Sequence, residues 1–132
     1  MKKIEVVAAI IFDRDKFVIT KRAGGLFDGL WEFPGGKIEP NETHENALKR
    51  EINEELNIKI SIESYLNTIE YEYDTFHLVM HLYFCKIEDG AIKLNEHSDI
   101  KWITTNDKEN INWVPADVQV LDLISSSRFL CK

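Results

Sequence analysis

The chain has 132 residues and a formal net charge of −7, and 44% of its residues are hydrophobic while 30% are charged. This length predicts one domain spanning residues 1–132, and the acidic balance disfavours a nonspecific binder of nucleic-acid polymers, which needs a basic surface. A small anionic substrate stays compatible if cations offset the repulsion. The two cysteines, Cys85 and Cys131, lack metal-ligand spacing and are expected to be reduced thiols.

The amino-terminal segment predicts two neighbouring strands. Residues 4–12 indicate a buried strand and residues 16–22 its partner, with a turn at DRDK between them. The basic tip and the apolar run also suggest a signal peptide, but Glu5 interrupts the run and no small-residue cleavage site follows. No apolar run in the sequence is long enough to cross a membrane, so we expect a cytoplasmic protein without membrane contact.

A loop rich in glycine and aromatic residues follows over residues 23–42, and loops of this length in compact domains are often functional. A helix is then predicted from Thr43 to Leu56, with Asn41 or Thr43 as its cap. Its apolar residues recur with helical periodicity, which is typical of a helix that packs one face on a core.

The next segments are rich in Ile, Tyr, Phe and Val. Residues 58–73 and 76–87 predict two long strands with a turn near Asp74 and Thr75, and residues 100–104 predict a short strand. A second helix is predicted over residues 116–125.

This second predicted helix has Val118, Leu121 and Ile124 on its inward face. Strands and helices alternate without the regular order of βαβ units. We therefore expect an α+β sandwich with a mixed sheet.

The acidic residues of the first predicted helix crowd one part of its surface. At 100° per residue, Glu51, Glu54 and Glu55 fall within an arc of about 100°, beside the apolar arc that faces the core. A solvated acidic face is the ordinary meaning of such a cluster, although like charges at this spacing repel. Carboxylates at i, i+3 and i+4 are also the hard oxygen ligands that Mg²⁺ and Mn²⁺ prefer, and a shared cation would remove the repulsion. Arg50 is expected to pair with Glu42, either as a bidentate clamp or as an ordinary surface ion pair.

The stretch from Gly36 to Ile58 resembles the signature of the Nudix hydrolase family. That signature reads glycine, five residues, glutamate, seven residues, Arg-Glu, an aliphatic residue, any residue, Glu-Glu, any residue, glycine and an aliphatic residue, and this sequence departs from it once. Asn57 stands where the family has glycine, and asparagine is the next most tolerant residue of the left-handed backbone needed there. The stretches MKKIEVVAAII, LWEFPGGKIEP and VPAD extend the resemblance to the MutT-like branch, especially to bacterial CTP pyrophosphohydrolases.

The resemblance implies an α/β/α sandwich and Mg²⁺-dependent hydrolysis of a nucleoside triphosphate to a monophosphate and pyrophosphate, with Mn²⁺ as an alternative cofactor. We expect a monomer or a homodimer, a choice that the sequence does not make. The resemblance also implies a loop carboxylate, Glu96, that either binds metal or acts as the general base in place of Glu51. The catalytic residues implied are Arg50, Glu51, Glu54 and Glu96. The metal ligands implied are the carbonyl of Gly35 and the side chains of Glu51, Glu54, Glu55 and Glu96.

Three further residues are candidate substrate contacts at this stage. The resemblance places Arg22, at the end of the second strand, on a phosphate, and Phe33 in the pocket for the nucleobase. Phe33 and its neighbour Trp31 are also suited to plain core packing. His81 alternates in register with the strand residues around it, so it either faces the pocket or is a hydrogen-bonded histidine within the sheet.

Asp117 bears on the choice of base. MutT-type 8-oxo-dGTPases carry asparagine at the matching position, and an ionised carboxylate, which only accepts hydrogen bonds, suits an exocyclic amine such as N4 of cytosine. Burial can protonate a carboxyl group, and Asp117 is also well placed to cap the following helix. CTP, dCTP or a modified dNTP (5-methyl or oxidised) is therefore the expected substrate. The alternatives are 8-oxo-dGTP, another nucleoside diphosphate derivative or, least expected, a non-catalytic nucleotide-binding module.

Overall fold

The computed structural model describes residues 2–95, 97 and 99–127. The strands are β1 (Lys2–Asp13), β2 (Lys16–Lys21), β3 (Trp31–Glu32), β4 (Gly35–Lys37), β5 (Lys59–Glu72), β6 (Phe76–Asp89) and β7 (Asp99–Ile103). The helices are α1 (His44–Leu56) and α2 (Val120–Ser126), with 3-10 turns at Thr105–Asn110 and Pro115–Asp117. Over the described residues the sheet has the order β3-β2-β1-β6-β5, with β4 paired to β1 and β7 paired to β2.

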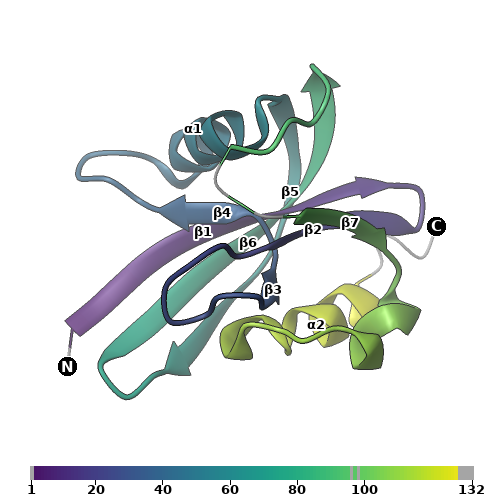
Figure 1. Cartoon of the computed structure of the whole chain (residues 1–132). Coiled ribbons are helices and arrows are strands. Elements are labelled where there is room, and N and C mark those ends of the chain that lie inside the picture. Colours follow the sequence, from purple (N-terminus) through teal and green to yellow (C-terminus); the bar gives the residue numbers. More distant parts are fainter. Residues whose placement is uncertain (1, 96, 98, 128–132) are drawn as a thin grey trace.

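The sheet is mixed, because β1 runs parallel to β6 while the other pairs are antiparallel. Helix α1 covers one face and α2 the other, so the predicted α+β sandwich is confirmed (Figure 1). Along β1 the side chains alternate between the two cores: Ala8 and Ile10 pack toward α2, while Val7, Ala9 and Ile11 pack toward α1. Residues 7–11 of this strand are all apolar because both faces of the strand are covered there.

The N-cap and the buried face of helix α1 follow from its sequence. Thr43 is the cap, since its hydroxyl accepts from Asn46 N at 3.1 Å, and Asn41 is not. Leu48, Ile52 and Leu56 are fully buried against the sheet, as the wheel predicts.

The second predicted helix is wrong in its first turn. Pro115–Asp117 forms a 3-10 turn and α2 begins only at Val120, so Val118 lies between the two elements and is 41% exposed. Leu121 and Ile124 face the core as predicted.

The long loop after β2 contains two short strands that the sequence did not reveal. Both are too short to show a periodicity, and they are held by pairing with other elements: β3 with β2, and β4 with β1. Trp31 is buried in the core. It therefore has the packing role, which was one of the two roles suggested for it by the sequence.

The free thiol of Cys85 is buried, and burial raises its pKa to about 12, while Cys131 lies outside the described residues. Within the described part of the chain, no helix combines the length and apolar character needed to cross a membrane.

Candidate functional site

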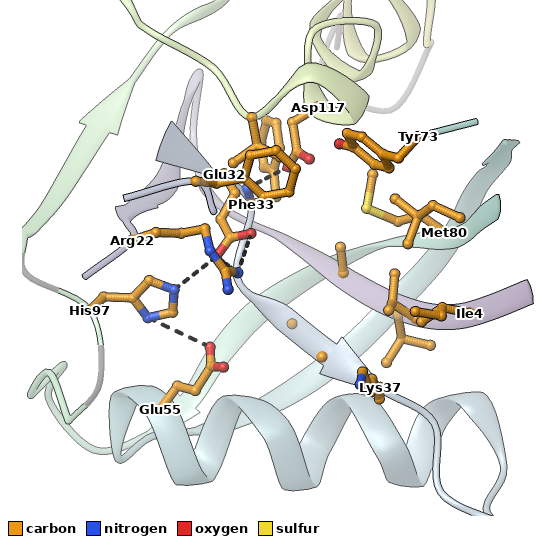
Figure 2. A pocket seen from close by; sticks show the side chains of 18 of the residues that line it. Ile4, Arg22, Glu32, Phe33, Lys37, Glu55, Tyr73, Met80, His97 and Asp117 are labelled. Carbon is orange, nitrogen blue, oxygen red and sulfur yellow. Dashed lines mark hydrogen bonds and ion pairs between the residues drawn. The ribbon is translucent and has the colours of Figure 1, made fainter. Parts of the chain in front are cut away.

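A cleft of about 390 Å³ runs from the turn before α2 to the surface of α1. Figure 2 shows Asp117, Tyr73 and Met80 at one end of the cleft, Glu55 and His97 at the other, and Glu32 between them. The first end is lined mostly by apolar side chains: Ile4, Phe27, Phe33, Phe76, Leu78 and Met80. The second end is lined by charged groups and by the main chain of β4.

Arg50 ties the loop before α1 to the helix. Its Nε and Nη2 donate to the two carboxylate oxygens of Glu42 at 2.8 and 2.9 Å, so the predicted bidentate pair is confirmed. Its Nη2 also donates to the carbonyl of Lys37 at 3.1 Å, and its Nη1 donates to Glu51 at 2.8 Å. The hydrogen bond from Arg50 is the main cause that lowers the pKa of Glu42 to about 2. Arg50 therefore fixes the approach of β4 to α1 and holds the Glu51 carboxylate in place.

The carboxylates of Glu51, Glu54 and Glu55 on α1 have different surroundings. Glu51 is mostly buried against β4, Glu55 is nearly buried and lines the cleft, and Glu54 is 59% exposed, with Arg50 Nη1 at 3.5 Å. Among the described residues, no three His, Cys, Asp or Glu side chains are gathered closely enough to hold a metal ion. Glu54 would have to turn away from Arg50 to join Glu51, which costs little for an exposed side chain at this distance.

The main chain beside these carboxylates leaves room for them and offers a further oxygen. A Cβ at Gly36 would lie 2.3 Å from the Glu51 carboxyl group, so only glycine lets that carboxylate sit there. Ala9 N donates to Pro34 O and Ile38 N to Glu5 O, which places Gly35 in a pair without mutual hydrogen bonds.

The Gly35 carbonyl therefore points away from β1 and is available as a ligand. Glu51, Glu54, Glu55 and this carbonyl offer oxygens of the hard kind that Mg²⁺ and Mn²⁺ prefer, although Glu54 would have to turn to join the others. The remaining predicted ligand, Glu96, lies outside the described residues.

Arg22 does not reach into the cleft as a free cation. Its Nη1 donates to both oxygens of Glu32 at 3.2 and 3.0 Å, and His97 Nε2 lies 3.0 Å from Glu32 Oε2. Sequence reasoning missed Glu32 and His97. Glu32 carried a signal, because it is a charged residue within a run of buried aromatics, whereas nothing local to His97 indicated its place.

The apolar end of the cleft is built around Asp117 and Phe33. Asp117 is 4% exposed, and its Oδ2 accepts from the main-chain N–H of Phe33 at 2.9 Å. It does not cap α2, whose N-cap residue is Gln119. Burial, and secondarily the nearby charge of Glu32, hold the pKa of Asp117 well above its usual range. Phe33 is buried, stacks on Trp113 with ring centroids 5.7 Å apart, and also lines the cleft.

The structure places His81 apart from the other candidate residues. On β6 it points to the face opposite Met80, which lines the cleft. Its Nδ1 is 2.8 Å from Thr68 Oγ1, and its ring stacks on His44 at 4.1 Å between centroids. His81 therefore has the contacts of a hydrogen-bonded histidine within the sheet.

Comparison with known proteins gives one consistent picture. The family model described as the NUDIX domain matches residues 2–124. The CTP pyrophosphohydrolase of Escherichia coli K12 is 35% identical over 131 residues, which cover 97% of this chain and 96% of that protein. The 8-oxo-dGTP diphosphatase of the same organism is 30% identical over 123 residues, which cover 92% and 95%.

Two solved structures share this architecture. The solution structure of the E. coli ORF135 protein has a TM-score of 0.83 at 34% identity, covering 98% of this chain and 93% of that one. A MutT NUDIX hydrolase from Burkholderia pseudomallei has a TM-score of 0.85 at 23% identity, covering 94% and 99%, and this second likeness concerns the fold alone.

Proposed function

The chain belongs to the NUDIX hydrolase family, and from this premise we propose that it is a Mg²⁺-dependent pyrophosphohydrolase of CTP or dCTP, including their modified forms. The observation that carries the proposal is the continuity of one cleft. An apolar end with a buried carboxyl group, suited to a nucleobase, leads directly to Glu55 of α1 and to the main chain of Gly35 and Gly36, beside which the other α1 carboxylates lie, a surrounding suited to cations and phosphates. A nucleoside triphosphate has the same succession of an apolar base and a charged chain.

At the metal end, Glu51, Glu54, Glu55 and the carbonyl of Gly35 would hold the cation. A divalent cation bound there would offset the phosphate charge and lower the pKa of a bound water. Arg50 holds Glu51 in position, and Glu51 is one candidate for the general base. Glu96 stays the alternative base.

At the base end, Asp117 is the candidate for reading the base. Its Oδ2 is engaged by Phe33 N–H, so Oδ1 is the atom left to meet a ligand. An ionised Oδ1 accepts from an exocyclic amine such as N4 of cytosine, and a protonated carboxyl group can also donate. Cytosine nucleotides are therefore the proposed substrates, with 8-oxo-dGTP as the second candidate because a protonated Asp117 can donate from Oδ1.

The metal end is tested with Glu54→Gln, which keeps the size of the side chain and removes its charge. We expect turnover of CTP with Mg²⁺ to fall by orders of magnitude while the circular dichroism spectrum and the melting temperature stay close to those of the wild type. Glu45→Gln, in the first turn of the same helix, is the matched control and should keep normal turnover. Near-normal activity of Glu54→Gln would remove the metal-site proposal.

The base end is tested with Asp117→Asn and a panel of CTP, dCTP, 5-methyl-dCTP and 8-oxo-dGTP. The amide should shift the ranking of kcat/KM toward 8-oxo-dGTP, because with its oxygen on Phe33 N–H it always presents the donor that an ionised Oδ1 lacks. An unchanged ranking would show that Asp117 does not read the base. Measuring how much pyrophosphate and how much phosphate is released separates this activity from the hydrolysis of other diphosphate derivatives. The absence of any turnover would favour a binding module.

Three further expectations belong to the same proposal. We propose that residues 1–132 form one Nudix domain, that the protein acts in the cytoplasm, and that it is a monomer or a homodimer without nucleic-acid polymers as partners. Gel filtration with light scattering, at protein concentrations that span the assay range, measures the oligomeric state.

A further inference from the structure

His97 lies where the two ends of the cleft meet. Its side chain is only 7% exposed, although it belongs to the segment between β6 and β7. The backbone fixes it from both sides: Asn95 N donates to the carbonyl of Glu55 at 3.1 Å, and Asp99 opens β7, which pairs with β2. Figure 2 shows the imidazole between Glu32 and Glu55.

The first ring nitrogen of His97 has a partner. Nε2 lies 3.0 Å from Glu32 Oε2, and Glu32 also forms an ion pair with Arg22. A carboxylate in an ion pair only accepts, so we assign the proton to Nε2. A neutral imidazole then carries its lone pair on Nδ1.

The second ring nitrogen of His97 faces the metal end. Nδ1 is buried and has no hydrogen-bond partner among the described residues, and it lies 3.8 Å from Glu55 Oε2. This distance is too long for a hydrogen bond, and two acceptors do not bond to each other. Leaving a buried polar atom without a partner is unfavourable, so this site calls for a hydrogen-bond donor other than the described residues. A water molecule about 2.8 Å from each atom would donate one hydrogen to Nδ1 and one to the carboxylate.

We infer that His97 is a positioning residue of the metal end, whose Nδ1 accepts a hydrogen bond from a water molecule of the hydrated cation that Glu55 would hold. This inference rests on the proposed function. Glu32, and Arg22 behind it, would fix the ring so that Nδ1 stays directed at this water. Groups that orient ligands in this way contribute roughly 10- to 100-fold to metal affinity. The His97 imidazole would then connect Glu32, in the middle of the cleft, with Glu55 at the metal end.

The test separates the two nitrogens of His97 by substitution. A glutamine amide reaches the place of Nε2 and keeps the contact with Glu32, whereas an asparagine amide reaches only the place of Nδ1. Uptake of Mn²⁺ by the whole chain, without nucleotide, is followed by the electron paramagnetic resonance signal of the free ion. His97→Gln should weaken Mn²⁺ binding about 10-fold or more, and His97→Asn should weaken it less.

His77→Gln is the matched control, because His77 also pairs with a glutamate, Glu70, at 2.8 Å but lies outside the cleft. It should bind Mn²⁺ like the wild type. Wild-type affinity in His97→Gln, or a greater loss in His97→Asn than in His97→Gln, would overturn the inference alone. A wild-type protein that takes up no Mn²⁺ would overturn the proposed function and the inference with it.

A second readout is independent of affinity and of any substitution. Nitrogen-15 spectra of the histidine side chains should show His97 protonated on Nε2, and its Nδ1 resonance should shift when Mg²⁺ is added while that of His77 stays unchanged. A proton on Nδ1 in the Mg²⁺-loaded protein would contradict the proposed hydrogen bond.

Discussion

Asn57 shows how one residue can replace another when the backbone conformation is what matters. It has φ 58° and ψ 32°, the left-handed conformation that glycine adopts most easily, at the single position where the chain departs from the family signature. Its side chain adds a hydrogen bond to the carbonyl of Lys93 at 2.7 Å, which glycine cannot make. The substitution therefore keeps the helix end and ties it to the segment that leads to His97.

Substitutions of Asn57 can separate these two contributions. Asn57→Ala should lower the free energy of unfolding by about 1–2 kcal/mol, because alanine is strained at positive φ. Asn57→Gly should stay within about 1 kcal/mol of the wild type, because it loses only one exposed hydrogen bond. Urea titration measures both, and equal losses would mean that the bond to Lys93 matters more than the backbone conformation.

Asp117 predicts a pH dependence of stability. Its folded-state pKa is raised, so above the usual value near 3.8 the unfolded chain releases a proton that the native protein retains. This contribution to stability is therefore lost as the pH rises from about 4 through the raised pKa. Asp117→Asn cannot ionise and should show a weaker decline in urea-unfolding free energy between about pH 4 and pH 8. Parallel curves for the two proteins would mean that burial does not shift this pKa.

At the scale of elements, the contact of β4 with α1 and β1 depends on two adjacent glycines with different neighbours. A Cβ at Gly35 would lie 1.9 Å from the main-chain oxygen of Val7, whereas a Cβ at Gly36 would meet only the flexible end of Glu51. The first glycine serves strand pairing and the second serves the position of a candidate ligand. Arg50 then holds the same junction from the side of α1.

Alanine should therefore affect stability at Gly35 and metal binding at Gly36. Gly35→Ala should lower the free energy of unfolding by about 2 kcal/mol or more, because main-chain atoms must move. Gly36→Ala should unfold within about 1 kcal/mol of the wild type but lose Mn²⁺ uptake and turnover, because Glu51 is displaced. Calorimetry and Mn²⁺ titration compare them, and a Gly36→Ala protein with normal Mn²⁺ binding would argue against Glu51 as a ligand.

At the scale of the molecule, two cores share one sheet. Among the described residues, the core under α2 and the core under α1 lie on opposite faces of the same strands, chiefly β1 and β6. Most of the cleft lies on the α2 side of this sheet, while its metal end reaches α1 past the edge strand β4. The two functional ends of the cleft therefore rest on different cores.

This arrangement predicts a gradient of stability. The main-chain amides of β1 from Val7 to Ile11 should exchange hydrogen only through global unfolding, because these residues are buried, are paired with β6 throughout and lie at the centre of the sheet. Amides of β4 and β7, which are paired on one side over the described residues, should exchange through local openings and therefore faster. Native-state hydrogen exchange followed by NMR measures this, and equal protection in β4 and β1 would contradict it.

The features that the sequence predicts are those whose patterns involve residues close together in the chain. The long strands, α1 and its apolar face appear as periodicities, and the Arg50 pair with Glu42 appears as a fixed spacing. The short β3 and β4 have no periodicity to detect. Val118 was assigned to a helix face because a 3-10 turn and the start of a helix have nearly the same pattern.

The sequence by itself determined the family, the mixed α+β sandwich and the carboxylates of α1, because these depend on residues close together in the chain. Only the tertiary structure decided that Arg22 meets Glu32, that His97 stands between Glu32 and Glu55, and that His81 faces away from the cleft. These contacts join segments that are distant in sequence, and they are set by strand order and register. No local pattern encodes the order or the register of strands, since both follow from how the whole chain buries its two cores.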